Sequence, residues 1–177
     1  MSNIFSNIII AIFLIIIQGL FLNNVNFLEW LNPYIYLYFI IYFPLKSNRT
    51  LYITISFLYG LIIDFFSDMH AIHSAACLII AYSRPYFLKL YFGMAYEHQV
   101  VKFNSLEIKQ NIFYLFNIII IHHLTLFCLE IFDVTKISLI LSNTLSNSIF
   151  TFFSIYVLYE FLLNNNKRSW EEIFFSL

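Results

Sequence analysis

The residues of this sequence whose types and spacing could support chemistry are few, and the densest group lies near the middle of the chain. Two carboxylates and two imidazoles fall within ten residues, namely Asp64, Asp68, His70 and His73. Carboxylate and imidazole together form an acceptable ligand set for zinc or another divalent cation. The spacing matches no established metal motif, however, and Asp68 or Ser67 could cap a following helix by accepting from its free N–H groups. Capping and hydrogen bonding across the turn, including a bond from Asp64 to His73 or to the start of the following helix, are therefore favoured over a metal site.

A second candidate group is the pair His122 and His123, which lies inside a long apolar run. Adjacent residues on a helix point about 100° apart, so an undistorted helix cannot aim both rings at one small site. His123 and Glu130 share a helix face but lie about 10 Å apart along the axis, too far for a direct bond. A neutral histidine bonded to a neighbouring helix is therefore favoured over a proton relay or a metal ligand. We expect the pair near the bilayer midplane and the Asp64 to His73 group at the outer surface, which argues against an intramembrane metal enzyme with one shared site.

Two isolated charges, Arg84 and Glu160, are expected in the last turns of their helices on the cytoplasmic side, with their charged ends reaching the membrane surface. Pro85 directly follows Arg84 and favours the end of a helix there, where contact of Arg84 with lipid phosphates is favoured over contact with a cytoplasmic partner. The sequence contains neither a Gly-x-Ser-x-Gly elbow nor a Walker-type loop. We therefore predict no catalytic residue, no metal ligand and no cofactor.

The elements that position these residues follow from composition. Of the 177 residues 61% are hydrophobic and 11% are charged, whereas soluble domains average about 25% charged. So few charged residues cannot cover an ordinary soluble domain, and lipid must surround most of this surface. Nine basic and ten acidic residues give a net charge of −1, which offers no electrostatic footprint for nucleic acid.

Apolar runs of nearly membrane-spanning length recur along the chain. Crossing a hydrocarbon core of about 30 Å takes about 20 helical residues. We predict one integral membrane domain over residues 1–177, an all-α polytopic bundle of about six transmembrane helices. The predicted spans are about 4–22, 31–45, 51–66, 71–88, 112–129 and 137–163.

The basic residues predict the orientation of these spans, because Lys and Arg near membrane segments stay on the cytoplasmic side. With the N-terminus inside, eight of the nine basic residues are cytoplasmic and Lys136 alone lies outside. The sequence thus predicts cytoplasmic N- and C-termini.

The outer half of the last predicted span carries small and amide-bearing residues. Small residues four apart allow helices to approach closely, and amides bond across such contacts. This stripe is favoured as a packing face over a channel lining, and whether it meets the same chain or a partner is left open. Its members are Ser142, Asn143, Thr144, Ser146, Asn147, Ser148, Thr151 and Ser154.

Several segments resemble the rod shape-determining MreD family, with the character of its Bacteroidetes members. The resemblance rests on residues 60–67 (GLIIDFFS), 71–76 (AIHSAA) and 81–86 (AYSRPY), and it extends to 121–130 and 158–162. With the length and the six-span plan, it covers most of the chain. Two departures are visible: Ala71 replaces a glycine usual shortly before the histidine, and His70 stands where a proline or an apolar residue is commoner.

The resemblance implies a non-catalytic subunit of the cell-elongation complex in the inner (cytoplasmic) membrane. Such proteins bind the bitopic protein MreC and, with it, link the actin-like MreB filament to the glycosyltransferase RodA and its transpeptidase partner, which positions peptidoglycan synthesis and maintains cell shape. The implied fold is similar to the S component of energy-coupling-factor transporters, so a small-molecule-binding subunit of a vitamin-type transporter is the alternative. A homo-oligomer is left open. The residues singled out for partner binding or structure are Asp64, His73, Arg84, His123, Glu130, Asn143, Asn147 and Glu160.

Overall fold

The computed structural model describes residues 4–23, 31–44, 48–98 and 108–175, with side chains described at 8–23, 31–44, 48–98 and 109–162. Helix accounts for 86% of the described residues and none of them forms a strand, which confirms the predicted all-α class. Two charges that predict the orientation, Lys46 and Lys102, lie outside the described residues.

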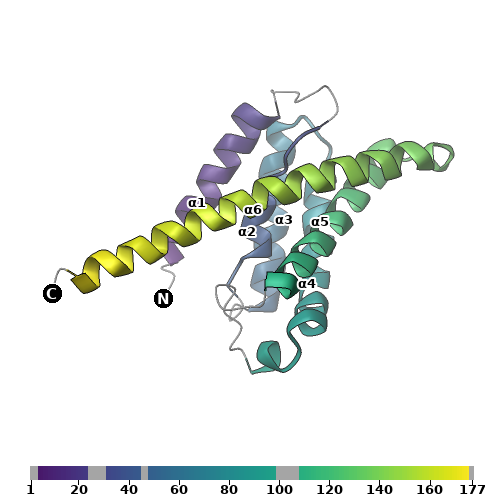
Figure 1. The fold of residues 1–177 in the computed structure, drawn as a ribbon. Coiled ribbons are helices and arrows are strands. Elements are labelled where there is room, and N and C mark those ends of the chain that lie inside the picture. Colours follow the sequence, from purple (N-terminus) through teal and green to yellow (C-terminus); the bar gives the residue numbers. More distant parts are fainter. Residues whose placement is uncertain (1–3, 24–30, 45–47, 99–107, 176–177) are drawn as a thin grey trace.

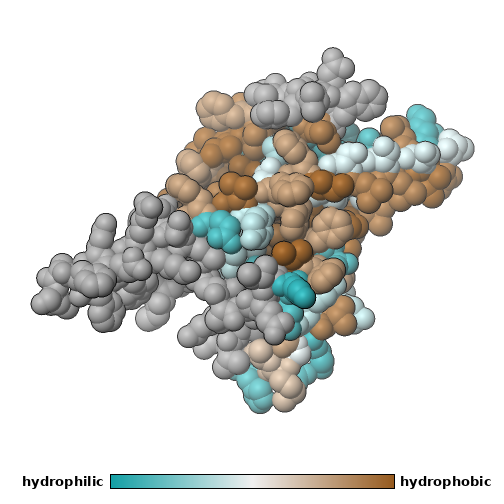
Figure 2. All heavy atoms as spheres, viewed as in Figure 1, coloured by the Kyte–Doolittle hydropathy of each residue, from teal (hydrophilic) through white to brown (hydrophobic). Residues whose placement is uncertain are grey.

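Three helical stretches are long and apolar enough to cross a membrane: Arg49–Phe66, Lys109–Ile131 and Val134–Leu162. A shorter apolar helix covers Ile8–Leu22. Many large hydrophobic side chains on these elements are exposed, which suits lipid and not water. In Figure 2 hydrophobic side chains cover much of the described surface of this face, and hydrophilic ones form smaller patches near its middle and at its lower end.

The first predicted span consists of two helical pieces. Helix α1 (Ile4–Ile16) continues directly into the π-helical turn η1 (Ile17–Leu22), where Gln18 and Gly19 are buried. Wider π-helical turns re-aim side chains and often occur at functional sites. Here the amide of Gln18 donates to Asn23, the residue that follows the turn.

The second predicted span differs most from its expected form. Within 31–44 only α2 (Leu37–Ile41) is α-helical, and five residues rise only about 7.5 Å along a helix. Pro33 does not begin a long helix, because residues 31–34 form no helix and the chain turns into α2 only at Tyr36. The segment is nevertheless central: Tyr36, Leu37, Ile40 and Ile41 are almost completely buried.

The third and fourth predicted spans form a closely packed antiparallel pair, α3 (Arg49–Phe66) and α4 (Ile72–Glu97). Asn48 caps α3 by accepting a hydrogen bond from the N–H of Thr50. A Cβ added at Gly60 would lie 2.5 Å from the Cα of Ser74, so only glycine permits this approach. The close crossing sets the end of α3 directly against the start of α4.

Helix α4 extends beyond the predicted end of the fourth span. The expectation that the helix ends at Pro85 is wrong, because it passes Pro85 and continues to Glu97. Gly93, at φ 45° and ψ −123°, introduces a sharp change of direction that the last turn follows in Figure 1. The exposed Lys89 Nζ lies 2.8 Å from Glu97 Oε1. This hydrogen bond raises the pKa of Lys89 and lowers the pKa of Glu97.

The last two spans form a second antiparallel pair, α5 (Ile108–Ile131) and α6 (Ile137–Phe175), joined by the 3-10 turn η3 (Val134–Lys136). Figure 1 shows α6 crossing obliquely over the other helices, with its C-terminal end extending beyond them. Its 39 residues would measure about 58 Å. That is nearly twice the hydrocarbon thickness of about 30 Å, so the whole of α6 cannot be a transmembrane segment.

Candidate functional site: a buried polar centre

The non-helical residues 31–34 are held in the protein by side chains of α6. The N–H of Asn32 donates to Asn147 Oδ1 at 2.9 Å, and the N–H of Tyr34 donates to Thr151 Oγ1 at 3.1 Å. Two residues of extended chain advance about 6.6 Å and four helical residues rise about 6 Å, so the two donors match the two acceptors. Non-helical backbone at membrane depth requires such internal partners. Part of the predicted α6 stripe therefore packs against this chain's own backbone.

The far end of the same segment is held by donors from three other helices. Tyr52 Oη of α3 donates to the carbonyl of Ile40 at 2.9 Å, and Tyr114 Oη of α5 donates to that of Ile41 at 3.2 Å. Arg84 Nη2 of α4 donates to the carbonyl of Phe43 at 2.6 Å. The last carbonyls of a helix lack internal partners, and these three donors meet that need at and just beyond the end of α2.

Arg84 is a central residue of the bundle, and the expectation that it reaches the membrane surface at a helix end is wrong. It is 4% exposed, its Nε donates to Tyr114 Oη at 3.2 Å, and its guanidinium lies 5.0 Å from the centre of the Tyr52 ring. The helix continues through Pro85, and three neighbouring elements close around the guanidinium. Carbonyl, hydroxyl and ring contacts stabilise this buried cation.

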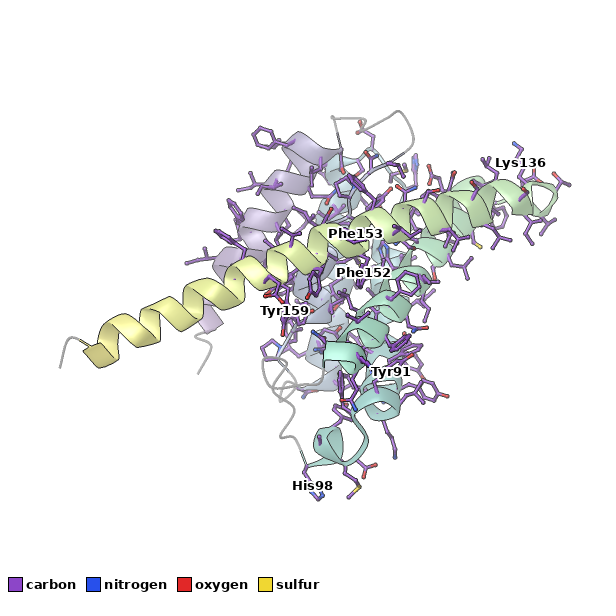
Figure 3. The ribbon with its side chains drawn as sticks, in the orientation of Figure 1. Tyr91, His98, Lys136, Phe152, Phe153 and Tyr159 are labelled. Atoms are coloured by element: carbon purple, nitrogen blue, oxygen red, sulfur yellow. The ribbon has the colours of Figure 1, made fainter. Side chains whose placement is uncertain are left out.

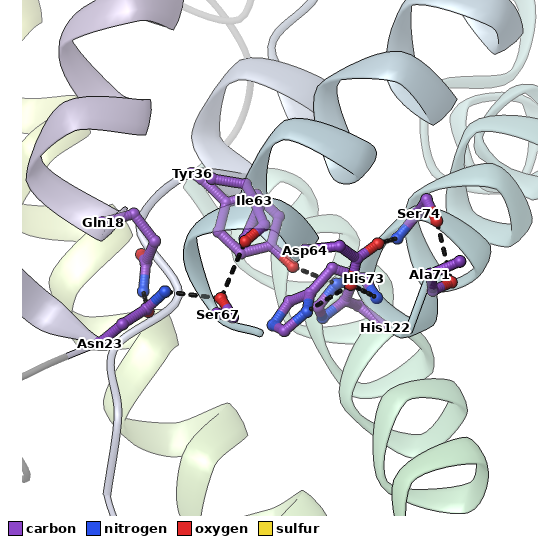
Figure 4. Close-up of polar contacts among 10 residues, drawn as sticks. All are labelled: Gln18, Asn23, Tyr36, Ile63, Asp64, Ser67, Ala71, His73, Ser74 and His122. Carbon is purple, nitrogen blue, oxygen red and sulfur yellow. Dashed lines mark hydrogen bonds and ion pairs between the residues drawn. The ribbon is translucent and has the colours of Figure 1, made fainter. Parts of the chain in front are cut away.

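At the opposite end of the bundle, Asp64 of α3 caps the first turn of α4. Its Oδ1 accepts from the N–H of His73 at 2.8 Å, and its Oδ2 accepts from the N–H of Ser74 at 2.8 Å. The His73 ring Nδ1 lies 3.0 Å from Oδ1, as Figure 4 shows. Of the three residues that could cap this helix, Asp64 accepts the bonds from the first turn, and Asp68 and Ser67 do not. Both Asp64 and His73 are buried in the protein interior.

A chain of amide and hydroxyl contacts connects η1 to the end of α3. Gln18 Nε2 donates to Asn23 Oδ1 at 2.8 Å, and Asn23 Nδ2 donates to Ser67 Oγ at 2.7 Å. Ser67 Oγ in turn donates to the carbonyl of Ile63 at 2.9 Å (Figure 4). The connection between α1 and α3 is therefore polar at this end and complements the apolar contacts elsewhere.

The two adjacent histidines bond to different elements, as expected for neighbouring helix residues whose side chains point about 100° apart. His122 Nε2 lies 2.8 Å from Tyr36 Oη (Figure 4), and its Nδ1 has no hydrogen-bond partner among the described residues. His123 Nδ1 lies 2.8 Å from the carbonyl of Ile119, which can only accept, so Nδ1 carries a proton. In the neutral ring, His123 Nε2 then accepts from Thr151 Oγ1 at 3.3 Å. Both rings are fully buried.

The rings of Tyr34 and Tyr36 join these contacts into one centre. The Tyr34 ring lies 5.0 Å from that of His123 and 5.9 Å from that of His73, measured between centroids. The Tyr36 ring lies 5.7 Å from that of His122 and 6.0 Å from that of His73. The two histidine groups, which were expected to lie apart, therefore meet in one centre, because Tyr34 and Tyr36 contact both.

Sequence reasoning missed these tyrosines because it assigned 31–45 to a regular span. A helix would put Tyr34 and Tyr38 on one face and Tyr36 nearly opposite, so Tyr34 and Tyr36 could not face the same centre. Their alternate spacing, directly after Pro33, is the sequence signal that favours an irregular or extended segment. Tyr52 and Tyr114 carry no such signal, since they lie in ordinary apolar helices.

The remaining predicted residues do not form hydrogen bonds in the centre. Glu130 is exposed near the end of α5 but lies close enough to Tyr34 and His73 to interact with them electrostatically, and Glu160 is exposed on α6. Asn143 is half-buried and lines a surface groove of about 510 Å3 beside α6. Among the predicted site residues the structure thus brings together Asp64, His73, His123 and Asn147, and it places Arg84 at the other end of the same buried segment.

Most polar groups of the centre bond to other groups of the same chain, with His122 Nδ1 as an exception among the described residues. Among the described residues, no group of three or more His, Cys, Asp or Glu side chains could hold a metal ion. The acceptors of Asp64, Asn147 and Thr151 are directed at backbone N–H groups, and the donors of Tyr52, Arg84 and Tyr114 at carbonyls. The arrangement stabilises an irregular segment within a membrane bundle.

The described part of the chain is thus all-helical, and three of its helices have the length and apolarity of membrane-spanning helices. No family model, curated protein or solved structure matches it.

Proposed function

We propose that this chain is a non-catalytic inner-membrane subunit of the MreD type, which binds the single-span protein MreC and helps position peptidoglycan synthesis in the cell-elongation complex. In this proposal the chain crosses the membrane about six times with cytoplasmic termini, its fold is similar to the S components, and its contact with MreB and RodA is indirect. The segments 60–67, 71–76 and 81–86 motivate the proposal. They also supply Asp64, His73 and Arg84, three of the residues that organise the bundle.

The observation that carries the proposal is the filled interior. A transporter subunit needs a cavity near the bilayer midplane where polar groups face a substrate. Here the rings of Tyr34 and Tyr36 occupy the middle of the bundle and pack on three histidines. The groove of about 510 Å3 lies on the outside, between Leu31 and one face of α6. A filled interior and an external groove suit a scaffold that binds other membrane proteins.

Affinity purification of the tagged, full-length chain from cells that also produce MreC tests this function. We expect MreC to co-purify, and we expect cells depleted of the chain to become round because wall synthesis loses its elongation pattern. A depleted strain that keeps its rod shape and its pattern of wall synthesis contradicts the proposal. A vitamin-sized molecule retained stoichiometrically through purification supports the transporter alternative instead.

A further inference from the structure

The external groove beside α6 lies next to side chains that are unusual at membrane depth. Ser142, Asn143 and Ser146 line the groove, and Ser142 and Ser146 are exposed. The side chains of these three residues form no hydrogen bond with the described part of the chain, in contrast to the neighbouring Asn147 and Thr151. Figure 2 shows a pale, weakly polar band along the right-hand part of α6, bordered by hydrophobic side chains.

Lipid tails cannot satisfy these polar groups. An amide or hydroxyl without a partner in an apolar medium is destabilising. At 1.5 Å per residue, Ser142 and Ser146 lie about 8 Å and about 14 Å from the start of α6, within the hydrocarbon layer if the helix begins at its edge. An occupant at this depth must itself satisfy its backbone, and an α-helix does so. Serines four residues apart allow such a helix to approach closely.

A charge on the same face identifies the kind of helix. Glu160 follows Ser142 by about five turns of 3.6 residues, so the two side chains point in nearly the same direction, about 27 Å apart along the axis. Glu160 is exposed and lies at the end of the apolar stretch Val134–Leu162. The groove face therefore has small polar residues at one depth and a carboxylate near the membrane surface.

This charge distinguishes two occupants. A second copy of the chain, packed through the same face about a two-fold axis along the membrane normal, would bring Glu160 close to its own symmetry mate, and like charges repel. A single-span helix with a cytoplasmic N-terminus normally carries Lys or Arg at its cytoplasmic end. In the predicted orientation that end lies at the depth of Glu160, so the two charges are complementary.

We infer that the groove lined by Leu31, Ser142, Asn143, Ser146 and Phe153 binds one transmembrane helix of a single-span partner. Small or hydroxyl-bearing residues of that helix face Ser142 and Ser146, and a basic residue at its cytoplasmic end pairs with Glu160. The inference rests on the proposed function, which supplies a single-span partner, and it adds the binding surface and the chemistry of the helix.

The test combines a steric change, a charge change and a matched control, with co-produced MreC as the probe. Ser146→Leu fills the groove and should reduce MreC recovery at least tenfold, whereas Ser146→Ala should retain it. Leu141→Ala, at a similar depth on another exposed flank of α6, should have no effect. Glu160→Lys should reduce recovery, and exchanging the basic residues at the cytoplasmic end of the MreC helix for Glu should restore it.

The outcomes separate this inference from the proposed function. Failure of the wild-type chain to recover MreC contradicts the proposed function and, with it, the surface. Normal recovery with both Ser146→Leu and Glu160→Lys contradicts the surface alone. A photo-crosslinker at position 146 that captures a second copy of this chain, in place of MreC, also overturns the inference. Size-exclusion profiles that match the wild type exclude misfolding as the cause of any loss.

Discussion

At the scale of single residues, the polar side chains inside this bundle serve backbone groups. Asp64 and Arg84 illustrate how far the sequence could predict this. The motif around Asp64 indicated a hydrogen bond to His73 or to the start of the next helix, because the two lie across a short turn. The environment of Arg84 was not predictable, since its partners Phe43 and Tyr114 are distant in sequence and its neighbour Pro85 favours a helix end that does not occur.

Substitution of Asp64 tests its capping role. Asp64→Asn keeps one oxygen acceptor and should destabilise the protein moderately, whereas Asp64→Leu leaves the N–H groups of His73 and Ser74 unpaired. Each unpaired buried group costs about 1–3 kcal/mol, so leucine should be clearly worse. Reversible unfolding in mixed micelles measures the difference. Asp68→Asn is the control, because Asp68 is exposed at φ 51°, a conformation that asparagine also tolerates. Equal tolerance of Asn and Leu at position 64 would count against a capping role.

At the scale of elements, regular helices were predictable and the irregular segment was not. Long apolar runs predicted the bounds of α3, α5 and the apolar part of α6 within a few residues. An apolar segment in lipid must satisfy its backbone hydrogen bonds internally, and a helix does so. The same rule failed over 31–45. The hydrogen bonds that a helix would supply to this segment are replaced by side chains from other elements: Asn147 and Thr151 accept, and Tyr52, Arg84 and Tyr114 donate. A local sequence pattern cannot reveal partners that lie so far along the chain.

The close crossing of α3 and α4 gives a prediction at this scale. Gly60→Ala introduces a Cβ at about 2.5 Å from the Cα of Ser74, so the helices must separate and the Asp64 cap must lengthen. Overpacking of this kind costs about 1–3 kcal/mol, and Gly60→Leu should cost more. Unfolding in mixed micelles again provides the measurement, with Leu58→Ala on the exposed face of α3 as the control. An unchanged midpoint for Gly60→Ala would show that the two helices can move apart freely.

At the scale of the whole molecule, the arrangement of charges predicts which ends face the cytoplasm. Figure 3 shows Lys136 and His98 at widely separated extremities of the protein. Lys136 is the one basic residue that the predicted orientation leaves outside, and His98 follows the last turn of α4. The six-span topology remains a prediction, since three stretches meet the length and apolarity of a membrane-spanning helix.

Cysteine labelling in spheroplasts tests the orientation. The native Cys128 is exposed and is replaced by serine, while Cys77 is buried and is retained. Lys136→Cys should react with a membrane-impermeant maleimide in intact spheroplasts, and His98→Cys should react only after the membrane is permeabilised. The parent that carries Cys128→Ser alone supplies the background. The reverse pattern would place the termini outside and would invert the predicted topology.

The bonds between α6 and residues 31–34 also have a consequence for the order of biogenesis. The N–H groups of Asn32 and Tyr34 are synthesised 115 and 117 residues before the side chains that accept from them. Until α6 is synthesised, these two N–H groups lack their final acceptors, and lipid offers none. We therefore expect the segment to stay at the insertion machinery or at the membrane surface until α6 emerges. The last helix therefore completes the interior of the protein, and a ribosome that stops before Asn147 releases a chain whose centre cannot close.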